Sequence, residues 1–296
     1  MAIRAEWIAV DWGTSNLRAF AMRGETVLAE ATSDHGMSRL EKPEFGPALM
    51  ALIGDWLGEG VTDVVACGMV GARQGWAEAP YSAVPSAPLA GNAVLVGGTD
   101  ARVRVFIVPG LKQEKPADVM RGEETQVAGF LAKNPNWDGV ICLPGTHTKW
   151  VHVSADEVVS FRTFMTGEMF ALLSKASVLQ HSVGEGWDEA AFEDGLSTTL
   201  SRPESIGAEL FGIRANDLLN ATPAAAGRAR LSGLLLGAEL AAARPYWLGQ
   251  NIAVIGDAKL SEIYAKALKT QGGFVSVANC QEMTIAGLAA ARNLLG

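Results

Sequence analysis

Two stretches of the 296-residue chain decide its fold: IAVDWGTS at residues 8–15 and, 132 residues later, VICLPGTH at residues 140–147. Each is an apolar run that ends in Gly-Thr and is followed by a second apolar run, at 17–22 and 150–153. Short apolar runs bounded by turn residues are typical of β-strands. We therefore expect two β-hairpins with Gly-Thr at their tips, and their likeness indicates two related domains.

Strand-like and helical patterns alternate along the rest of the chain, which predicts the α/β class. We expect further strands at 26–31, 63–67, 103–108, 158–162, 252–255 and 274–278, and helices at 45–58, 123–132, 168–181, 189–200, 204–219, 224–243, 260–270 and 284–295. Three prolines predict an extended loop, rather than an element, at 79–89. The expected domains are 1–130 and 131–296, with the boundary within 115–138. The last helix, 284–295, is a candidate for packing back on the first domain.

The composition excludes several classes of protein. Lys and Arg number 24 against 32 Asp and Glu, and a net charge of −8 argues against a nucleic-acid or anionic-membrane partner. Cys67, Cys142 and Cys280 are an odd set beside apolar runs, which indicates free thiols in a reducing cytoplasm. No lysine follows a glycine, so a Walker A loop is excluded. We expect a cytoplasmic protein without membrane or nucleic-acid partners, and the apolar helices leave a homodimer open.

A Gly-Thr tip suits a phosphate group. Glycine lets the backbone approach closely, and the surrounding N–H groups and hydroxyls donate hydrogen bonds. Two such tips can hold the β- and γ-phosphates of a nucleotide, with a carboxylate at the first tip holding Mg²⁺ directly or through water. Asp11 stands at that place. The alternative is that Asp11-Trp12-Gly13 is only a tight turn closed by an Asx hydrogen bond.

Motifs spread over most of the chain resemble one known family. They are DWGTSNLR at 11–18, GMVG at 68–71, APY at 79–81, PGL at 109–111, MRGEETQ at 120–126, LPGTHTKW at 143–150, FRTFMTGE at 161–168 and LSGLLLGAE at 231–239. The chain is similar to the 2-dehydro-3-deoxygalactonokinase family of the actin-like ATPase and sugar kinase superfamily. The resemblance implies two actin-like (ribonuclease H-like) domains around an interdomain cleft. It also implies ATP-dependent phosphorylation of the 6-hydroxyl of 2-dehydro-3-deoxy-D-galactonate, in D-galactonate catabolism.

The resemblance also implies roles for residues at the nucleotide. Asp11 is the expected carboxylate linked to Mg²⁺. The expected ATP-binding residues are Gly13, Thr14, Ser15, Gly145, Thr146, Lys149 and Gly256. Two positions depart from the wider superfamily. Thr146-His147 stands where many sugar kinases have a second glycine or a serine, and Gly256-Asp257 stands where Gly-Gly is usual.

The proton acceptor is expected at the start of a helix. Other sugar kinases of the superfamily carry a Gly-Asp pair about twenty residues before the second tip. Here Gly122-Glu123-Glu124 opens the expected helix, and Glu123 lies 22 residues before Gly145. Adjacent residues point to different helix faces, so only one carboxylate can meet the sugar hydroxyl. We favour Glu123, with Glu124 in reserve. The alternative is that both only stabilise the helix N-terminus.

The substrate is a 2-oxo acid, and a guanidinium is the natural partner of its carboxylate. The candidates are Arg18, Arg73, Arg121 and Arg162. Trp76 and Tyr81 are candidates for a wall beside the sugar chain, or for the core. Glu168 either binds sugar hydroxyls or caps the helix that follows it.

Three other functions stay open at this point. One is the same chemistry on a related sugar acid, such as 2-dehydro-3-deoxygluconate, because one sequence does not reveal the stereochemistry of a hydroxyl. Another is a nucleotide hydrolase or regulatory ATPase of the same fold, with water as the acceptor. The third is a sensor that binds ATP without turnover.

Overall fold

The computed structural model describes residues 3–295, which form two compact units. The first unit takes the chain up to Asp138, then Val153–Phe161, and the chain from Ala278 onward. The second unit takes Gly139–His152 and Arg162–Val277. No helix in this part of the chain is long and apolar enough to cross a membrane.

The first unit is built on a six-stranded sheet of order β3-β2-β1-β4-β7-β6. Its strands are β1 (Trp7–Trp12), β2 (Leu17–Arg23), β3 (Thr26–Ser33), β4 (Thr62–Gly68), β6 (Val94–Leu95) and β7 (Val103–Ile107). β1 is antiparallel to β2 and parallel to β4. It is a near-continuous apolar strand, as expected for a strand covered on both faces.

Alternate residues of β1 enter two different cores. Ile8 and Val10 pack in the cluster that contains helix α1 (Phe45–Ile53), whereas Trp7 and Ala9 pack with helix α9 (Cys280–Asn293). This follows from the period of two along a strand, which sends successive side chains to opposite faces. The last helix of the chain therefore belongs to the first unit.

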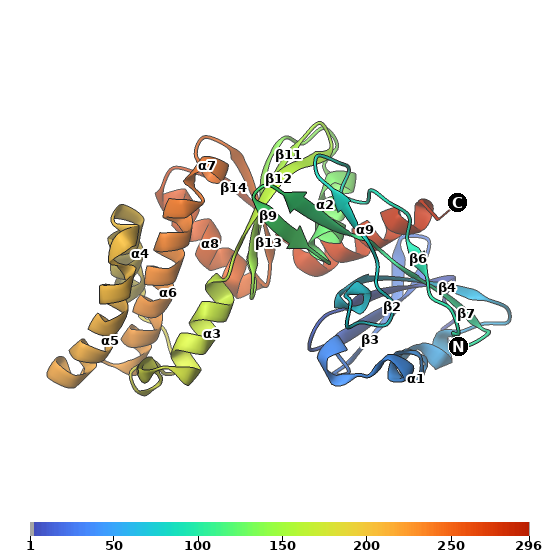
Figure 1. Ribbon diagram of the computed structural model, residues 1–296, viewed down its shortest axis with the longest axis horizontal. Helices are drawn as coiled ribbons and strands as arrows, with labels where there is room; N and C mark the ends of the chain where they lie inside the picture. Colours follow the sequence, from blue (N-terminus) through green and yellow to red (C-terminus); the bar gives the residue numbers. More distant parts are fainter. Residues whose placement is uncertain (1–2, 296) are drawn as a thin grey trace. The chain divides into compact units, whose positions relative to one another are not determined.

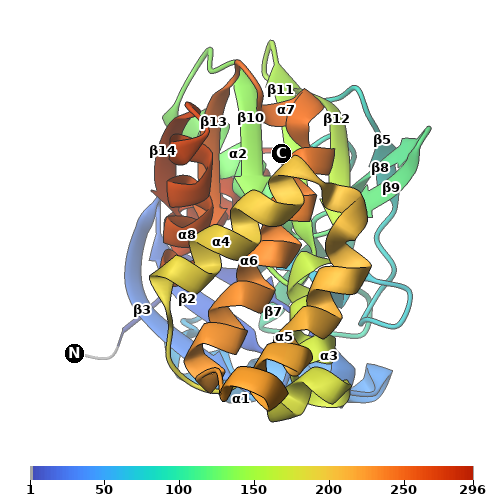
Figure 2. The same ribbon diagram turned by 90° about the vertical axis from the view of Figure 1, so that its left-hand side faces the viewer.

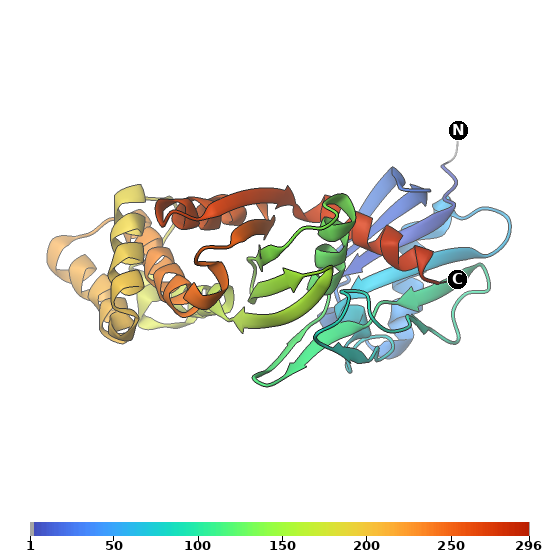
Figure 3. The same cartoon turned by 90° about the horizontal axis from the view of Figure 1, so that it is seen from above.

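Helix α9 packs very closely on helix α2 (Glu123–Lys133), beside it in Figures 1 and 3. A Cβ on Gly287 of α9 would lie 1.8 Å from the carbonyl oxygen of Thr125, and one on Gly129 of α2 would lie 1.9 Å from that of Met283. The two glycines let the backbones of the helices touch. This contact fixes α2, which carries both candidate proton acceptors at its start.

A small second sheet in the first unit was not expected. It joins β5 (Tyr81–Ala83), β8 (Gly110–Glu114) and β9 (Ala117–Met120) in the order β5-β8-β9. β5 corrects the prediction that 79–89 is loop throughout. These strands are short and half polar, so they lack the apolar run that reveals a strand in sequence.

The second unit centres on the parallel strands β10 (Gly139–Leu143) and β13 (Asn251–Gly256). They lie in a five-stranded sheet of order β12-β11-β10-β13-β14, with β11 at Thr148–Ser154, β12 at Glu157–Phe164 and β14 at Phe274–Asn279. Its helices are α3 (Thr166–Ala176), α4 (Glu189–Ser201), α5 (Ile206–Asn220), α6 (Ala224–Ala242), α7 (Arg244–Trp247) and α8 (Ala258–Thr270). α4, α5 and α6 lie side by side in Figures 1 and 2.

The observed elements agree with the predicted α/β alternation, with shifts at the ends. The helix expected at 45–58 ends at Ile53 and continues as a 3₁₀ turn, Gly54–Trp56. The helix expected at 168–181 is α3 followed by a separate 3₁₀ turn, Val178–His181. Helix ends are where sequence patterns locate structure least well.

Gly287→Ala tests the contact between α2 and α9. The added methyl group cannot avoid the Thr125 carbonyl without moving a helix, so we expect a loss of about 1–3 kcal/mol or more in the free energy of unfolding. Urea unfolding followed by circular dichroism measures it. The control is Gly54→Ala, where the Cβ meets nothing within 4 Å and the backbone is helical. Equal stability of the two variants would contradict the close contact.

Candidate active site

The first Gly-Thr turn (Gly13–Asn16) joins β1 to β2. Asp11 pairs with Arg18 across the hairpin, and Gly13 N–H donates to the carbonyl oxygen of Asn16 at 2.9 Å. The carboxylate of Asp11 is only partly exposed and accepts a 2.5 Å hydrogen bond from the guanidinium of Arg18. The predicted metal-linked carboxylate and one predicted substrate arginine are therefore an ion pair in this structure.

The Gly36 segment (Gly36–Ser38) holds this turn by hydrogen bonds to its carbonyl oxygens. The N–H of Met37 donates to Gly13 O and that of Ser38 to Thr14 O, both at 3.0 Å. A Cβ on Gly36 would lie 2.2 Å from the carbonyl carbon of Ser15, so only glycine fits. The carbonyl oxygens of Gly13, Thr14 and Asn16 are thus occupied, while the N–H groups of Thr14 and Ser15 have no acceptor within residues 3–295.

The second Gly-Thr turn (Pro144–His147) joins β10 to β11 and is held in the same way. The Gly167 segment (Thr166–Glu168) opens α3, and Glu168 N–H donates to Thr146 O at 2.9 Å. A Cβ on Gly167 would lie 2.2 Å from Gly145 O. The Glu168 carboxylate also lies 2.7 Å from Nε2 of His147. Glu168 therefore supports the turn, and its predicted contact with sugar hydroxyls stays a prediction.

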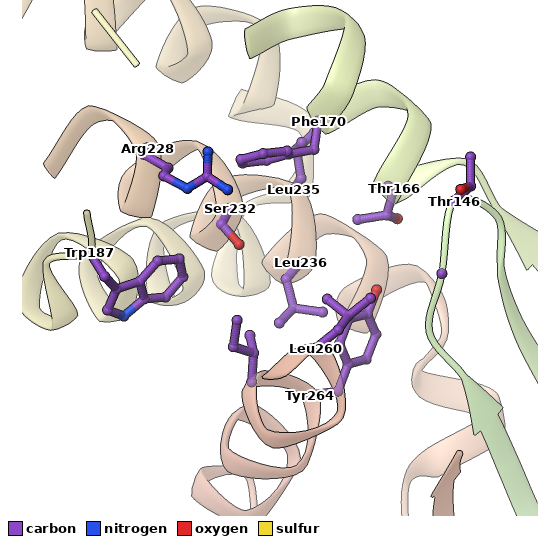
Figure 4. A pocket seen from close by; sticks show the side chains of 13 residues that line it. Thr146, Thr166, Phe170, Trp187, Arg228, Ser232, Leu235, Leu236, Leu260 and Tyr264 are labelled. Atoms are coloured by element: carbon purple, nitrogen blue, oxygen red, sulfur yellow. The ribbon is translucent and has the colours of Figure 1, made fainter. Parts of the chain in front are cut away.

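A pocket of about 380 Å³ opens beside the second Gly-Thr turn. Thr146 and Thr166 lie at one end of it (Figure 4), and Gly145 and Gly167 also line it. The rest is lined by Phe170, Trp187, Arg228, Ser232, Leu235, Leu236, Leu260, Ile263 and Tyr264. The guanidinium of Arg228 lies 5.1 Å from the centre of the Phe170 ring. The lining is mostly apolar with a few polar groups, which is typical of a small-molecule site.

Sequence reasoning foresaw only part of this pocket. Leu260 and Tyr264 lie on the predicted helix that follows Gly256, one of the expected ATP-binding residues, but Phe170, Trp187 and Arg228 were not singled out. They come from three separate segments with no shared motif. Gly256 ends β13, and a Cβ there would lie 3.0 Å from Pro144 O, so this glycine lies against the second Gly-Thr turn. Lys149 is buried on β11.

The start of α2 comes together with Asp11 at one edge of the first sheet. β1 and β4 are parallel, so their carboxyl ends meet, and a Cβ on Gly68 would lie 3.6 Å from Oδ1 of Asp11. A Cβ on Gly122 would lie 3.3 Å from Cα of Gly68. The predicted proton acceptors therefore start from the same edge as the predicted metal ligand.

Glu123 and Glu124 differ sharply in environment. Glu124 is fully buried and accepts hydrogen bonds from Gly122 N–H at 2.7 Å and from the Thr125 hydroxyl at 3.1 Å. Burial, with the neighbouring charge of Glu123 as the second cause, raises the pKa of Glu124 to about 8. Glu123 is half-buried, and one of its carboxylate oxygens accepts from Arg121 N–H at 3.1 Å. Glu124 thus holds its proton at neutral pH.

The predicted substrate residues fall into different settings. Arg121 is 8% exposed, lies 4.2 Å from the centre of the Tyr81 ring and donates to Ala79 O at 2.7 Å. Its Nη1 is buried without a hydrogen-bond partner. The side chain of Arg73 is 84% exposed and lies 3.6 Å from Glu78. Trp76 packs against Trp12 and Phe45, at the edge of the core.

Arg162 lies exposed on β12. The structure thus joins Arg121 with Tyr81 and Arg18 with Asp11. Which arginine binds a carboxylate, and whether Trp76 contacts a sugar, stay predictions.

The chain is similar to known sugar-acid kinases over nearly its whole length. A family model described as 2-keto-3-deoxy-galactonokinase matches residues 11–291. The 2-dehydro-3-deoxygalactonokinase of Escherichia coli (strain K12) is 36% identical over 272 residues, which cover 90% of this chain and 91% of that protein. A protein of Rhizobium meliloti (strain 1021), named as a probable 2-dehydro-3-deoxygalactonokinase, is 38% identical over 301 residues, 98% of each chain.

Solved structures agree with these sequence matches. The crystal structure of a Sinorhizobium meliloti protein named for the same kinase activity matches with a TM-score of 0.90 and 38% identity, covering 98% of this chain and 96% of that one. Component A of (R)-2-hydroxyglutaryl-CoA dehydratase from Acidaminococcus fermentans matches with a TM-score of 0.54 at 11% identity, which shows a shared fold alone.

These findings confirm the fold class and the family that the motifs predicted. "Keto" and "dehydro" name the same carbonyl group, so the family model and the two relatives describe one family. The matched region contains both Gly-Thr turns and the start of α2. The chain belongs to the 2-keto-3-deoxy-galactonokinase family.

Proposed function

We propose that this protein is an ATP-dependent kinase that phosphorylates the 6-hydroxyl of 2-dehydro-3-deoxy-D-galactonate, in D-galactonate breakdown. The observation that carries the proposal is the family match, which spans the two Gly-Thr turns. Two relatives named for the same kinase activity support it. The geometry of the turns supports it, because phosphoryl transfer depends mostly on positioning and on neutralising charge.

The two Gly-Thr turns are the proposed phosphate sites. In the first, bonded carbonyl oxygens and unbonded N–H groups at Thr14 and Ser15 leave donors for an anion. In the second, the Gly167 segment occupies Thr146 O in the same manner. Backbone N–H groups fixed in this way need no reorganisation when phosphate binds, which is the basis of electrostatic preorganisation.

Mg²⁺ fits the residues at the first turn. Within residues 3–295 no cluster of three or more His, Cys, Asp or Glu could hold a metal by itself. Mg²⁺ bound with a nucleotide needs only one or two carboxylates, the rest being water and phosphate oxygens. Asp11 supplies such a carboxylate, and in this structure Arg18 balances its charge. When bound, the metal neutralises charge on the transferring phosphoryl group.

The pocket beside the second turn is the proposed nucleoside site. Its lining offers apolar surface from Leu236 and Leu260 and aromatic faces from Phe170 and Trp187 (Figure 4). A structure with the same fold supports nucleotide binding. The activator of 2-hydroxyisocaproyl-CoA dehydratase from Clostridium difficile, with a TM-score of 0.50 at 11% identity, was solved with bound ADPNP.

Glu123 is the proposed acceptor of the proton from the 6-hydroxyl. It is the more accessible member of the pair, whereas Glu124 is buried and protonated at neutral pH. Arg121 is the proposed partner of the substrate carboxylate. A buried guanidinium with an unpartnered Nη1 favours a charged acceptor, since an unmade hydrogen bond costs free energy. Arg18 is occupied by Asp11, and Arg73 is at the surface.

A coupled ADP-release screen over 2-dehydro-3-deoxy sugar acids tests the function. We expect ADP release that depends on the galactonate compound, with lower kcat/KM for the gluconate epimer. Preference for the gluconate compound would change the substrate assignment. ADP release unaffected by every sugar acid would indicate a hydrolase and overturn the proposal, and so would ATP binding without any turnover.

Glu123→Gln tests the proton acceptor. The amide cannot take a proton, so we expect kcat to fall about 10²–10⁴-fold while the dissociation constants of both substrates change little. Steady-state kinetics and calorimetric titration measure these values. The matched control is Glu124→Gln. Because the pKa of Glu124 is raised to about 8, this group is mostly protonated at pH 7, and kcat of the Glu124→Gln variant at that pH is expected to stay within about threefold of wild type. The reverse pattern would assign the base to Glu124.

Arg121→Met tests the carboxylate partner. Loss of a charge-assisted hydrogen bond costs about 1.5–3 kcal/mol, so we expect KM for the sugar acid to rise about 10- to 150-fold with KM for ATP unchanged. Arg73→Met removes an exposed charge and serves as the control, with both KM values expected near those of wild type. A large rise for Arg73→Met and none for Arg121→Met would transfer the role to Arg73.

A further inference from the structure

A buried carboxylate on helix α6 has no role in the function proposed so far. Glu239 is 2% exposed and accepts three hydrogen bonds. Trp150 Nε1 donates to Oε1 at 2.9 Å, and the Tyr264 hydroxyl donates to Oε2 at 2.9 Å. The Thr166 hydroxyl also donates to Oε2. Around one side chain, the second unit thus gathers donors from β11, α3 and α8.

Each of these donors adjoins the second Gly-Thr turn or the pocket beside it. Thr166 opens the Gly167 segment, and the next residue lies directly against Gly145. Tyr264 lines the pocket, and its hydroxyl also lies 3.0 Å from Thr148 Oγ1, at the point where β11 leaves the turn. Trp150 lies two residues further along β11. Figure 4 places Thr166 and Tyr264 on the side of the pocket nearest Thr146.

Holding a carboxyl group in this place is costly. Burial raises the pKa of Glu239 above its ordinary value, against the opposing effect of its three hydrogen bonds. The neighbours along the buried face of α6 are Leu235, Leu236 and Leu240, so an apolar side chain is the easier choice for packing. A buried polar group with all its hydrogen bonds made instead fixes one arrangement of the elements that it joins, because in any other arrangement its donors lose their acceptor.

We propose that Glu239 is a positioning residue for nucleotide binding: it holds Thr166 and Tyr264 so that the second Gly-Thr turn and the wall of the pocket keep the form that ATP requires. The inference rests on the proposed function, because it takes the pocket to be the nucleoside site. Glu239 acts through its neighbours and does not line the pocket itself.

The proposal predicts an effect confined to the nucleotide. Without the carboxylate, the Thr166 hydroxyl and the Trp150 N–H lose their acceptor, and the Gly167 segment is no longer held against the turn from this side. Arg121 and Glu123, the residues proposed above for the sugar acid, belong to the first unit. KM for ATP is therefore expected to rise, whereas KM for the sugar acid stays near that of wild type.

The experiment measures binding of a non-hydrolysable ATP analogue with Mg²⁺ by calorimetry. Glu239→Ala is expected to raise Kd at least tenfold, which corresponds to about 1.4 kcal/mol. Glu239→Gln is expected to restore Kd to within about threefold of wild type, since its oxygen still accepts from Trp150 and its NH₂ can donate to the two hydroxyls. Normal binding by Glu239→Ala, or binding by Glu239→Gln that is as weak as that of Glu239→Ala, would contradict the proposal.

The control is Thr199→Val. Thr199 is fully buried on α4 and donates to Leu234 O of α6 at 2.6 Å, and neither residue lines the pocket. This variant is expected to lower Tm and to leave Kd unchanged. If Glu239→Ala likewise lowers Tm and leaves Kd unchanged, Glu239 is only structural and the proposal is overturned.

Tyr264→Phe keeps the test decisive if Glu239→Ala does not fold. It retains the ring on the pocket wall and removes one donor to Glu239. We expect Tyr264→Phe to raise Kd for the analogue, because it removes one of the hydrogen bonds through which Glu239 holds the pocket wall. An unchanged Kd would contradict the proposal. If the wild-type protein binds the analogue but phosphorylates no sugar acid, the proposed function alone is overturned.

Discussion

Each unit contains a Gly-Thr turn whose form depends on hydrogen bonds to its carbonyl oxygens. Ser38 N–H binds Thr14 O in the first unit, and Glu168 N–H binds Thr146 O in the second. Each donor belongs to a segment whose glycine lies against the turn, at a distance that admits no side chain. A turn fixed through its carbonyl groups directs its remaining polarity, the N–H groups, to a ligand, and such donors favour an anion. The same construction thus occurs twice in one chain.

Each unit also contains a buried carboxyl group near these residues. Glu124 accepts a hydrogen bond from Gly122 N–H near Asp11, and Glu239 accepts one from the Thr166 hydroxyl beside Gly167. Burial raises the pKa of both groups and keeps them out of contact with a substrate that enters from solvent, while each accepts hydrogen bonds from nearby donors. Acidic residues near these turns therefore have two different proposed tasks, contact with ligands and support of the backbone. Asp11, which is partly exposed and paired with Arg18, and the half-buried Glu123 are the groups proposed for metal and proton, while the two buried groups are suited to holding backbone segments in place.

The sequence predicted the parts of the fold that have a local signal. The runs at 8–15 and 140–147 combine an apolar strand with a Gly-Thr tip, and both hairpins are present. The sheet of β5, β8 and β9 was missed because its strands are short and half polar. The pocket was only partly foreseen, since Phe170, Trp187 and Arg228 come together through tertiary packing. Position along a helix left Glu123 and Glu124 as alternative proton acceptors. The two differ in burial, which no local sequence pattern reveals.

A net charge of −8 appears at odds with two anionic ligands, yet the proposed site needs no basic surface. Net charge governs solubility and long-range attraction, whereas binding depends on groups in contact with the ligand. Backbone N–H groups provide positive potential without adding a formal charge, and the arginine nearest the first turn is already neutralised by Asp11. The proposed function therefore needs no basic surface: phosphate would be bound through the backbone of the turns, and one buried guanidinium, Arg121, is the proposed partner of the carboxylate.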